Sequence, residues 1–91
     1  MTDKILDEKL RTGIEQLDAG NTKEAITTLK EYCQNHQDDA DSWFYLGDAL
    51  AEDGQIAEAI ERYRAGLKLA PTDLDALTTL GDLLFEAGQH S

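Results

Sequence analysis

Residues 40–73 read ADSWFYLGDALAEDGQIAEAIERYRAGLKLAPTD, and the pattern of this stretch recurs on both sides of it with a spacing of 34 residues. The recurring positions form four series, which are Gly13/Gly47/Gly81, Gly20/Gly54/Gly88, Asp7/Asp41/Asp75 and Ala25/Ala59. A fixed period of this length is typical of an array, in which each unit is too small to bury its own apolar face and stacks on its neighbour. We therefore divide one domain, 1–91, into a unit at 6–39, a second at 40–73 and the first part of a third at 74–91. Such an array favours a surface that holds another molecule over a pocket that performs chemistry.

The composition predicts an all-α fold. The chain has no valine and no run that alternates apolar with polar residues, whereas good helix formers are abundant. We expect five helices, at 4–19, 22–36, 40–53, 56–69 and 74–87. Connections of two to four residues would make neighbouring helices antiparallel.

The ends of these helices carry recognisable residues. Gly20, Gly54 and Gly88 follow the ends of predicted helices, where a left-handed residue is favoured. Candidates for the N-cap are Asp39 or Asp41 on the third helix and Thr72 or Asp73 on the fifth.

The glycines in the middle of helices predict close packing. Each of Gly13, Gly47 and Gly81 costs up to about 1 kcal/mol relative to alanine in a helix. Because this loss of helix stability recurs at the same position of each repeat, we expect a neighbouring helix to pack closely against each of these glycines. Ala25 and Ala59 would be the small partners on the second helix of each pair.

The charge balance limits the classes of partner. Nineteen acids face eight bases, which gives a formal net charge of −11. Such a chain repels nucleic-acid backbones and anionic membrane surfaces, and it attracts basic peptides. The alternative is that the acids serve solubility, for example in a salt-rich cytoplasm that screens their repulsion. With no signal-peptide core and no apolar run of eighteen residues, we expect a cytoplasmic protein without a membrane segment.

Motifs of catalysis and metal binding are absent from the sequence. His36 and His90 have no further ligand at metal spacing, and Cys33, the single cysteine, is interpreted as a small core thiol. No glycine-rich phosphate loop, nucleophile elbow or pair of acids in a cleft is present. We therefore expect neither an enzyme nor a cofactor or metal site.

Residues 40–73 resemble the tetratricopeptide repeat. The positions that carry the resemblance are Trp43, Leu46, Gly47, Leu50, Gly54, Ala59, Tyr63, Gly66 and Pro71. Residues 74–91 resemble the first half of another repeat, and the first unit departs more from the pattern. The resemblance implies a right-handed α-α superhelix with a concave groove lined by the first helix of each pair.

The two ends of the array differ. Lys9, Thr12 and Gln16 replace large apolar residues in the first unit, as suits a face with no predecessor. Helix 74–87 instead presents leucines at 77, 80, 83 and 84 without a partner helix. We expect the chain to be the N-terminal part of a longer protein, while a tolerated cap or a surface that meets another molecule stays open. Weak self-association through helix 74–87 follows from the same leucines.

The resemblance also implies the residues of the groove. They are Leu10, Ile14, Asp41, Phe44, Tyr45, Asp48, Glu52, Asp75, Thr78, Asp82 and Phe85, with Asp7, Leu17, Asp18, Ala51 and Glu86 at matching positions. A peptide or partner protein held there would offer Lys or Arg to the acids and an apolar anchor to the aromatic and aliphatic side chains. Alternatively, the acids are solvated helix-face residues or first-turn acids, and the aliphatic residues of the first helix are core contacts.

One mode of binding in this family is excluded by the residues present. The two-carboxylate clamp for chaperone C-termini uses Lys, Asn, Asn, Lys and Arg. The corresponding positions are occupied by Leu10, Ile14, Tyr45, Asp75 and Thr79. Three functional hypotheses remain, namely a peptide-binding scaffold, a self-associating repeat segment, and the regulatory repeat domain of a longer enzyme.

Overall fold

The computed structural model describes residues 8–89 and contains five helices and no strand in that range. The helices are α2 (Glu8–Asp18), α3 (Thr22–Asn35), α4 (Ala40–Glu52), α5 (Ile56–Leu69) and α6 (Leu74–Gln89). The all-α prediction is confirmed, and the helix bounds differ from those expected by two residues at most where they can be compared. The predicted start of the first helix, at residues 4–7, lies outside the described residues.

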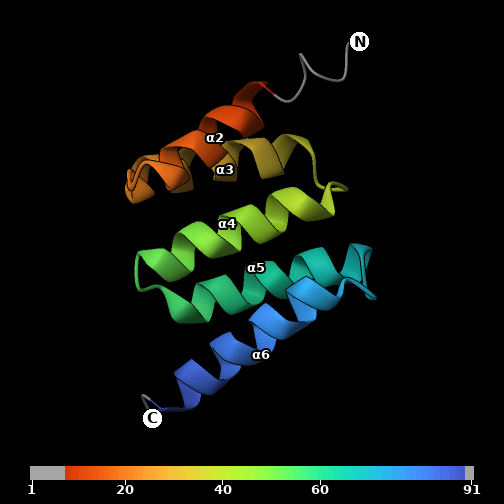
Figure 1. Cartoon of the computed structure of the whole chain (residues 1–91). Helices are drawn as coiled ribbons and strands as arrows, with labels where there is room; N and C mark the ends of the chain where they lie inside the picture. The colour runs from red at the N-terminus through yellow and green to blue at the C-terminus, as the bar shows by residue number, and fades with distance from the viewer. Residues whose placement is uncertain (1–7, 90–91) are drawn as a thin grey trace.

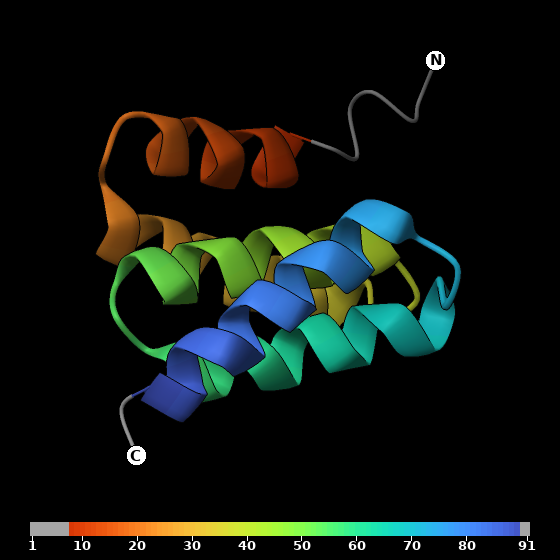
Figure 2. The ribbon, with the colours of Figure 1, turned by 60° about the horizontal axis from the view of Figure 1, so that its bottom comes forward.

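The helices stack in chain order with antiparallel neighbours (Figure 1). Each packs against the next along the chain, and α2 also touches α4. The result is an elongated body of 45 × 29 × 19 Å. Seen from below, α6 lies at the end of the stack, across α5 and in front of α4 (Figure 2). The core lies between the helices, where Leu29, Leu46 and Leu50 are almost completely buried.

Glycine ends two of the helices as predicted. Gly20 and Gly54 have φ angles of +88° and +83°. After α4, the N–H of Gln55 donates to the carbonyl of Leu50 at 2.9 Å, and the N–H of Gly54 donates to the carbonyl of Ala51 at 3.0 Å. These two bonds satisfy carbonyl groups that the end of a helix leaves free, and they reverse the chain.

The prediction that Gly88 ends the last helix is wrong. Gly88 is helical, because α6 continues to Gln89. Gly20 and Gly54 are each followed within two residues by a helix that packs back onto the previous one. Among residues 8–89 no helix follows α6, so nothing draws the chain into the left-handed turn.

Asp39 and Asp73, two of the four candidate N-caps, behave differently. Oδ1 of Asp73 accepts a hydrogen bond from the N–H of Ala76 at 3.1 Å, which confirms Asp73 as a cap of α6. Asp39 precedes α4, but its side chain forms no cap hydrogen bond. Its carboxylate instead accepts a bond from the hydroxyl of Tyr32 at 3.3 Å, and its carbonyl accepts one from Oγ of Ser42 at 2.7 Å.

Two of the three mid-helix glycines allow a close contact between helices. A Cβ atom on Gly13 would lie 2.7 Å from Cδ2 of Leu29, and one on Gly47 would lie 2.5 Å from Cδ1 of Tyr63 and 3.3 Å from the carbonyl oxygen of Ala59. Close packing is therefore confirmed at both positions. At Gly81 the prediction is wrong, since no atom lies within 4 Å of a Cβ placed there. The described residues contain no helix that covers α6 as α5 covers α4.

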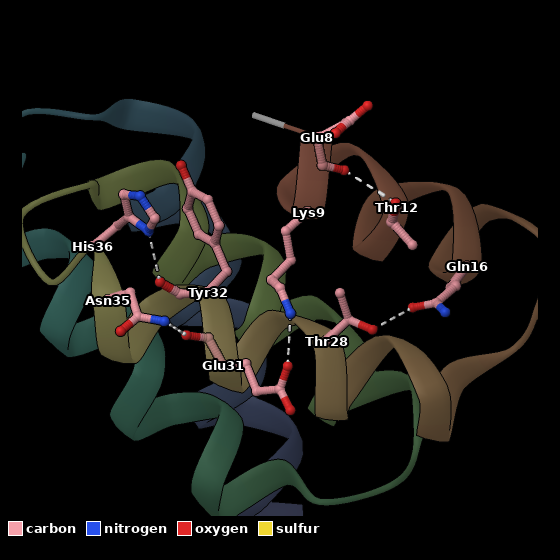
Figure 3. Close-up of polar contacts among 9 residues, drawn as sticks. All are labelled: Glu8, Lys9, Thr12, Gln16, Thr28, Glu31, Tyr32, Asn35 and His36. Atoms are coloured by element: carbon pink, nitrogen blue, oxygen red, sulfur yellow. Dashed lines mark hydrogen bonds and ion pairs between the residues drawn. The ribbon is translucent and has the colours of Figure 1, made fainter. Parts of the chain in front are cut away.

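Polar side chains of α2 and α3 contact one another within the first repeat (Figure 3). Nζ of Lys9 lies 2.8 Å from Oε1 of Glu31, and Oγ1 of Thr28 donates to Oε1 of Gln16 at 2.8 Å. Both contacts join α2 to α3. Leu10 and Leu17 of α2 pack against the core, which supports the core interpretation of these residues.

Candidate functional site

A hollow opens between α4, α5 and the beginning of α6. It has a volume of about 390 Å³. Its lining residues are Asp41, Phe44, Tyr45, Asp48, Tyr63, Asp73, Asp75, Ala76 and Thr79. The first helix of the second repeat therefore supplies one wall, and the start of the third repeat supplies the opposite wall.

A second hollow adjoins the first. It has a volume of about 570 Å³ and is lined by Leu17, Asp18, Gly20, Asp48, Ala51 and Glu52. Asp48 belongs to both linings, so the two hollows meet at its side chain. We call the residues of the two linings together the acidic groove.

The acidic groove carries negative charge without a basic residue of its own. Neither lining contains lysine or arginine. Within residues 8–89, the ion pairs use the carboxylates of Glu31, Asp53 and Glu58, none of which lines the groove. A negative potential therefore builds up along this surface, and it favours a cationic ligand.

The floor of the groove is fixed by a hydrogen bond between the two helices of the second repeat. The hydroxyl of Tyr63 in α5 donates to Oδ1 of Asp48 in α4. Burial raises the pKa of Asp48, the bond from Tyr63 lowers it, and the charge of Glu52 raises it again. Burial also raises the pKa of Tyr63 far above its ordinary value, and the hydrogen bond to Asp48 adds to the rise. The ring of Tyr63 stacks on Phe44 with centroids 5.1 Å apart.

The structure brings part of the predicted groove together. Asp41, Tyr45, Asp48 and Asp75 line the first hollow, and Glu52 lines the second. Phe44 also borders the first hollow, but it is 91% buried, because its ring fills the space beside Gly66 where a side chain is missing.

The remaining predicted residues lie elsewhere. Leu10 packs against the core, and Ile14 is half-buried outside both hollows. Thr78, Asp82 and Phe85 are exposed on α6 and line neither hollow, and the side chain of Phe85 is 70% exposed. Asp7 lies outside the described residues.

Sequence reasoning left three polar groove residues out of the predicted set. Tyr63 was assigned to the repeat pattern of a second helix, Asp73 to a cap, and Thr79 to a clamp position that does not match. All three line the first hollow. The position of Tyr63 in the repeat could have identified it. A tyrosine whose ring lies over Gly47 brings its hydroxyl to the next residue, Asp48.

Within residues 8–89, the structure shows neither a cluster of metal ligands nor an exposed cysteine. No group of three or more His, Cys, Asp or Glu residues is arranged to hold a metal ion within residues 8–89. Cys33 is buried, and burial raises the pKa of its thiol, which makes the thiolate scarce at neutral pH. No helix among these residues is long and apolar enough to cross a membrane.

Comparison with known proteins identifies the repeat. A family model described as tetratricopeptide repeat matches residues 10–73 and again residues 52–91. The chain belongs to the tetratricopeptide repeat family. A segment of 65 residues is 40% identical to the serine/threonine-protein kinase Pkn1 of Myxococcus xanthus. The alignment covers 67% of this chain and 9% of the kinase, so the chain spans a small part of that relative.

Tetratricopeptide repeats generally mediate interactions between proteins. In this tetratricopeptide repeat domain, the two hollows lie along the first helices α2, α4 and α6, and Gly20, Asp73 and Tyr63 are added from two turns and from α5. The face is therefore built mainly from the first helices of the repeats.

Proposed function

We propose that this chain is a binding module that holds a basic segment of a partner protein in the acidic groove. The observation that carries the proposal is the lining of the groove, which contains Asp18, Asp41, Asp48, Glu52, Asp73 and Asp75 without a single lysine or arginine. An extended segment with lysine or arginine would offset this charge, and an apolar anchor would pack on the partly exposed Tyr45. Absence of catalytic motifs in the sequence agrees with a scaffold and not an enzyme.

The affinity we expect is modest. The groove is open to solvent, and a flexible peptide loses conformational freedom when it binds. A dissociation constant of about 1 μM, or roughly −8 kcal/mol, is reasonable for such a site. Affinity should fall as salt rises, because exposed charges are screened.

The test uses a short peptide rich in arginine with one central leucine, and a counterpart in which glutamate replaces every arginine. Titration calorimetry at low and at physiological salt should detect binding of the first peptide alone. The double variant Asp41→Asn/Asp75→Asn should weaken it about tenfold, equivalent to about 1.4 kcal/mol. Both aspartates are exposed and lie in the first turn of their helices, so the change alters the groove with little effect on packing.

The matched control is Glu8→Gln/Glu24→Gln. These glutamates are also exposed and also lie in first turns, and neither lines the groove. The control removes the same charge from the molecule. Equal losses of affinity in the two double variants would mean that net charge governs binding, and the proposal would then be wrong.

A second candidate function is the repeat domain of a longer kinase-type protein. The observation that favours it is the 40% identity to a segment of the Pkn1 kinase, which amounts to 9% of that protein. The experiment is an immunoblot of the native polypeptide. A mass far above 10.1 kDa supports this candidate, and a mass equal to that of the 91-residue chain removes it.

A further inference from the structure

A further hollow lies between α3, α4 and α5 and shares no residue with the acidic groove. It has a volume of about 210 Å³, and its lining residues are Lys30, Cys33, Gln34, Trp43, Leu46 and Arg62. Most of these residues belong to the second helices α3 and α5, whereas the acidic groove is built mainly from first helices. Of the described residues, a lysine and an arginine line this hollow, and no aspartate or glutamate does. We call it the basic pocket.

The two cations of the basic pocket share one carboxylate oxygen. Nη2 of Arg62 donates to Oε2 of Glu58 at 2.9 Å, and Nζ of Lys30 lies 3.7 Å from the same oxygen atom. Within residues 8–89, neither cation forms an ion pair with any other residue. Glu58 itself does not line the pocket. One carboxylate therefore serves two neighbouring cations, and positive charge is left in excess at the pocket.

The guanidinium of Arg62 keeps donors that the fold does not use. Such a group carries five N–H bonds, and the hydrogen bond it forms here goes from Nη2 to Glu58. Its Nε is shielded from solvent and has no hydrogen-bond partner among residues 8–89. A buried donor without an acceptor costs free energy, and a carboxylate beside a guanidinium supplies acceptors. The pocket therefore has donor capacity for one more anionic group.

The opposite part of the pocket is apolar. Nε1 of Trp43 donates to the carbonyl of Gln37 at 3.1 Å, which fixes the orientation of the indole. Cζ of Arg62 lies 5.9 Å from the centroid of this ring, so the guanidinium is held beside the indole. Leu46 and Cys33, which are both almost completely buried, complete the apolar lining. Two cations and an apolar wall therefore meet in one hollow.

A glutamate side chain suits this combination in size and chemistry. Sites for small molecules usually have volumes above about 300 Å³, and the basic pocket is smaller, so it admits a single side chain. A carboxylate forms short, charge-assisted hydrogen bonds with guanidinium and ammonium groups. The two methylene groups of glutamate would contact the indole of Trp43. Inorganic phosphate would match the charge but would leave the apolar wall uncovered.

We propose that the basic pocket is a second docking site, which takes a glutamate side chain of a partner protein between Lys30 and Arg62. The site is separate from the acidic groove and does not depend on what that groove binds. The chain would then be a scaffold with two sites of opposite charge, one built on its first helices and one mainly on its second helices.

The single tryptophan of the chain makes the proposal testable at the pocket itself. Because no other residue is a tryptophan, the indole N–H signal in an NMR spectrum reports on Trp43 alone. The probe is the capped peptide Ala-Ala-Glu-Ala-Ala, and its counterpart has glutamine in place of glutamate. The titration uses about 0.15 M NaCl, which screens the long-range repulsion from the net charge of −11 beyond about 8 Å.

The glutamate peptide should shift the indole signal in a saturable way. A single side chain binds weakly, so we expect a dissociation constant on the order of 1 mM. The glutamine peptide should bind about fivefold or more weakly, because it lacks the charge that Lys30 and Arg62 attract. Equal shifts with the two peptides, or no shift with either, would overturn the proposal.

Lys30→Gln removes one cation of the pocket. It should weaken binding of the glutamate peptide about fivefold or more. The side chain of Lys30 is 44% exposed and its ion pair with Glu58 is long, so the change has little effect on folding. The matched control is Lys68→Gln, which removes the same charge from an exposed position of α5 outside the pocket. Equal losses in the two variants would mean that net charge governs binding, which contradicts the proposal.

Glu58→Gln tests the pocket in the opposite direction. It removes the carboxylate that competes for both cations, so the glutamate peptide should bind about threefold or more tightly. The matched control is Glu61→Gln, which removes the same charge from an exposed position one turn further along α5. A gain no larger than that of the control would show that the two cations do not hold the ligand, and the proposal would fail.

Two further outcomes would assign the pocket to another occupant. Inorganic phosphate that shifts the indole signal at a lower concentration than the glutamate peptide would make the site a phosphate site. A dimer that forms in sedimentation experiments with the wild type, and that Lys30→Gln dissociates, would place an acid of a second copy in the pocket. Either outcome overturns the assignment to a partner's glutamate.

Discussion

The hydroxyl of Tyr63 on α5 donates a hydrogen bond to Asp48 on α4, and Asp48 is the residue at which the two hollows of the acidic groove meet. The ring of the same tyrosine lies over Gly47. The side chain of Tyr63 therefore does two things: it packs the second repeat together, and it positions the carboxylate of Asp48 in the groove. A substitution at either residue should change both stability and the charge that a ligand meets.

The variant Asp48→Asn should be more stable than the wild type at neutral pH. Burial raises the pKa of Asp48, so the ionised form costs stability in the folded state, while an asparagine can still accept the bond from Tyr63. A raised carboxyl pKa means that the stabilising protonated form is present below the unfolded value, 3.8, and is lost as pH rises through the folded value. The difference in melting temperature between variant and wild type should therefore shrink as pH falls toward 3.8. A difference that grows on acidification would contradict the sign of this effect.

The glycines at 47 and 81 should respond to alanine in opposite directions. A Cβ on Gly47 would lie 2.5 Å from Cδ1 of Tyr63, so Gly47→Ala should lower the free energy of unfolding by about 1–3 kcal/mol. Gly81 is exposed in a helix with nothing nearby, so Gly81→Ala should raise it by about 0.5–1 kcal/mol. Urea denaturation measures both. Equal changes in the free energy of unfolding at the two positions would show that the close contact between Gly47 and Tyr63 does not contribute to stability.

Alanine should also have different effects at Gly54, which lies in a turn, and at Gly88, which lies in a helix. Gly54 has a φ angle of +83°, so Gly54→Ala should destabilise the chain by about 1–2 kcal/mol. Gly88 is helical and exposed, so Gly88→Ala should be neutral or stabilising by up to about 1 kcal/mol. Thermal denaturation of the two variants beside the wild type provides the comparison. If Gly88→Ala lowered stability as much as Gly54→Ala, Gly88 would have to lie in a left-handed turn, as the sequence predicted.

Added salt should stabilise the fold. The net charge is −11, and the acids of the groove repel one another, while raising the salt to about 1 M shortens the screening length to about 3 Å. The melting temperature should thus increase between dilute buffer and about 1 M NaCl. Sodium sulfate is not a suitable substitute, because it also strengthens burial of apolar groups. A melting temperature that stays level or falls in NaCl would mean that repulsion among the acids is unimportant for folding.

Periodicity of the sequence predicted the helices and the close contacts of Gly13 and Gly47, because each repeat must bury the same positions. It failed at Gly81 and Gly88 for one shared reason. Both predictions assumed that the pattern of a repeat fixes its local structure, whereas the contact above the glycine and the turn after it depend on the helix that comes next.

For the candidate site, position along the first helices predicted one surface for Asp41, Asp48 and Asp75, and all three line the first hollow. The same reasoning misjudged Phe44, because its burial depends on Gly66 of another helix, whose missing side chain makes room for the ring. The same reasoning also placed Asp82 and Phe85 in the groove, because the sequence does not show where along α6 the hollow ends. Asp75 and Thr79 at the beginning of α6 line the first hollow, and the later residues of the helix lie outside it.

Because each helix packs chiefly on its neighbours in the chain, the stack has a middle and two ends. Residues of α4 touch helices on both sides, whereas α6 is held mainly by α5. Backbone amides in α4 should therefore exchange hydrogen with solvent only when the whole domain opens, and those of α6 should exchange through local fraying. Protection measured along the chain would then decline from the centre toward the C-terminal helix, and a ligand that covers α6 would flatten this gradient.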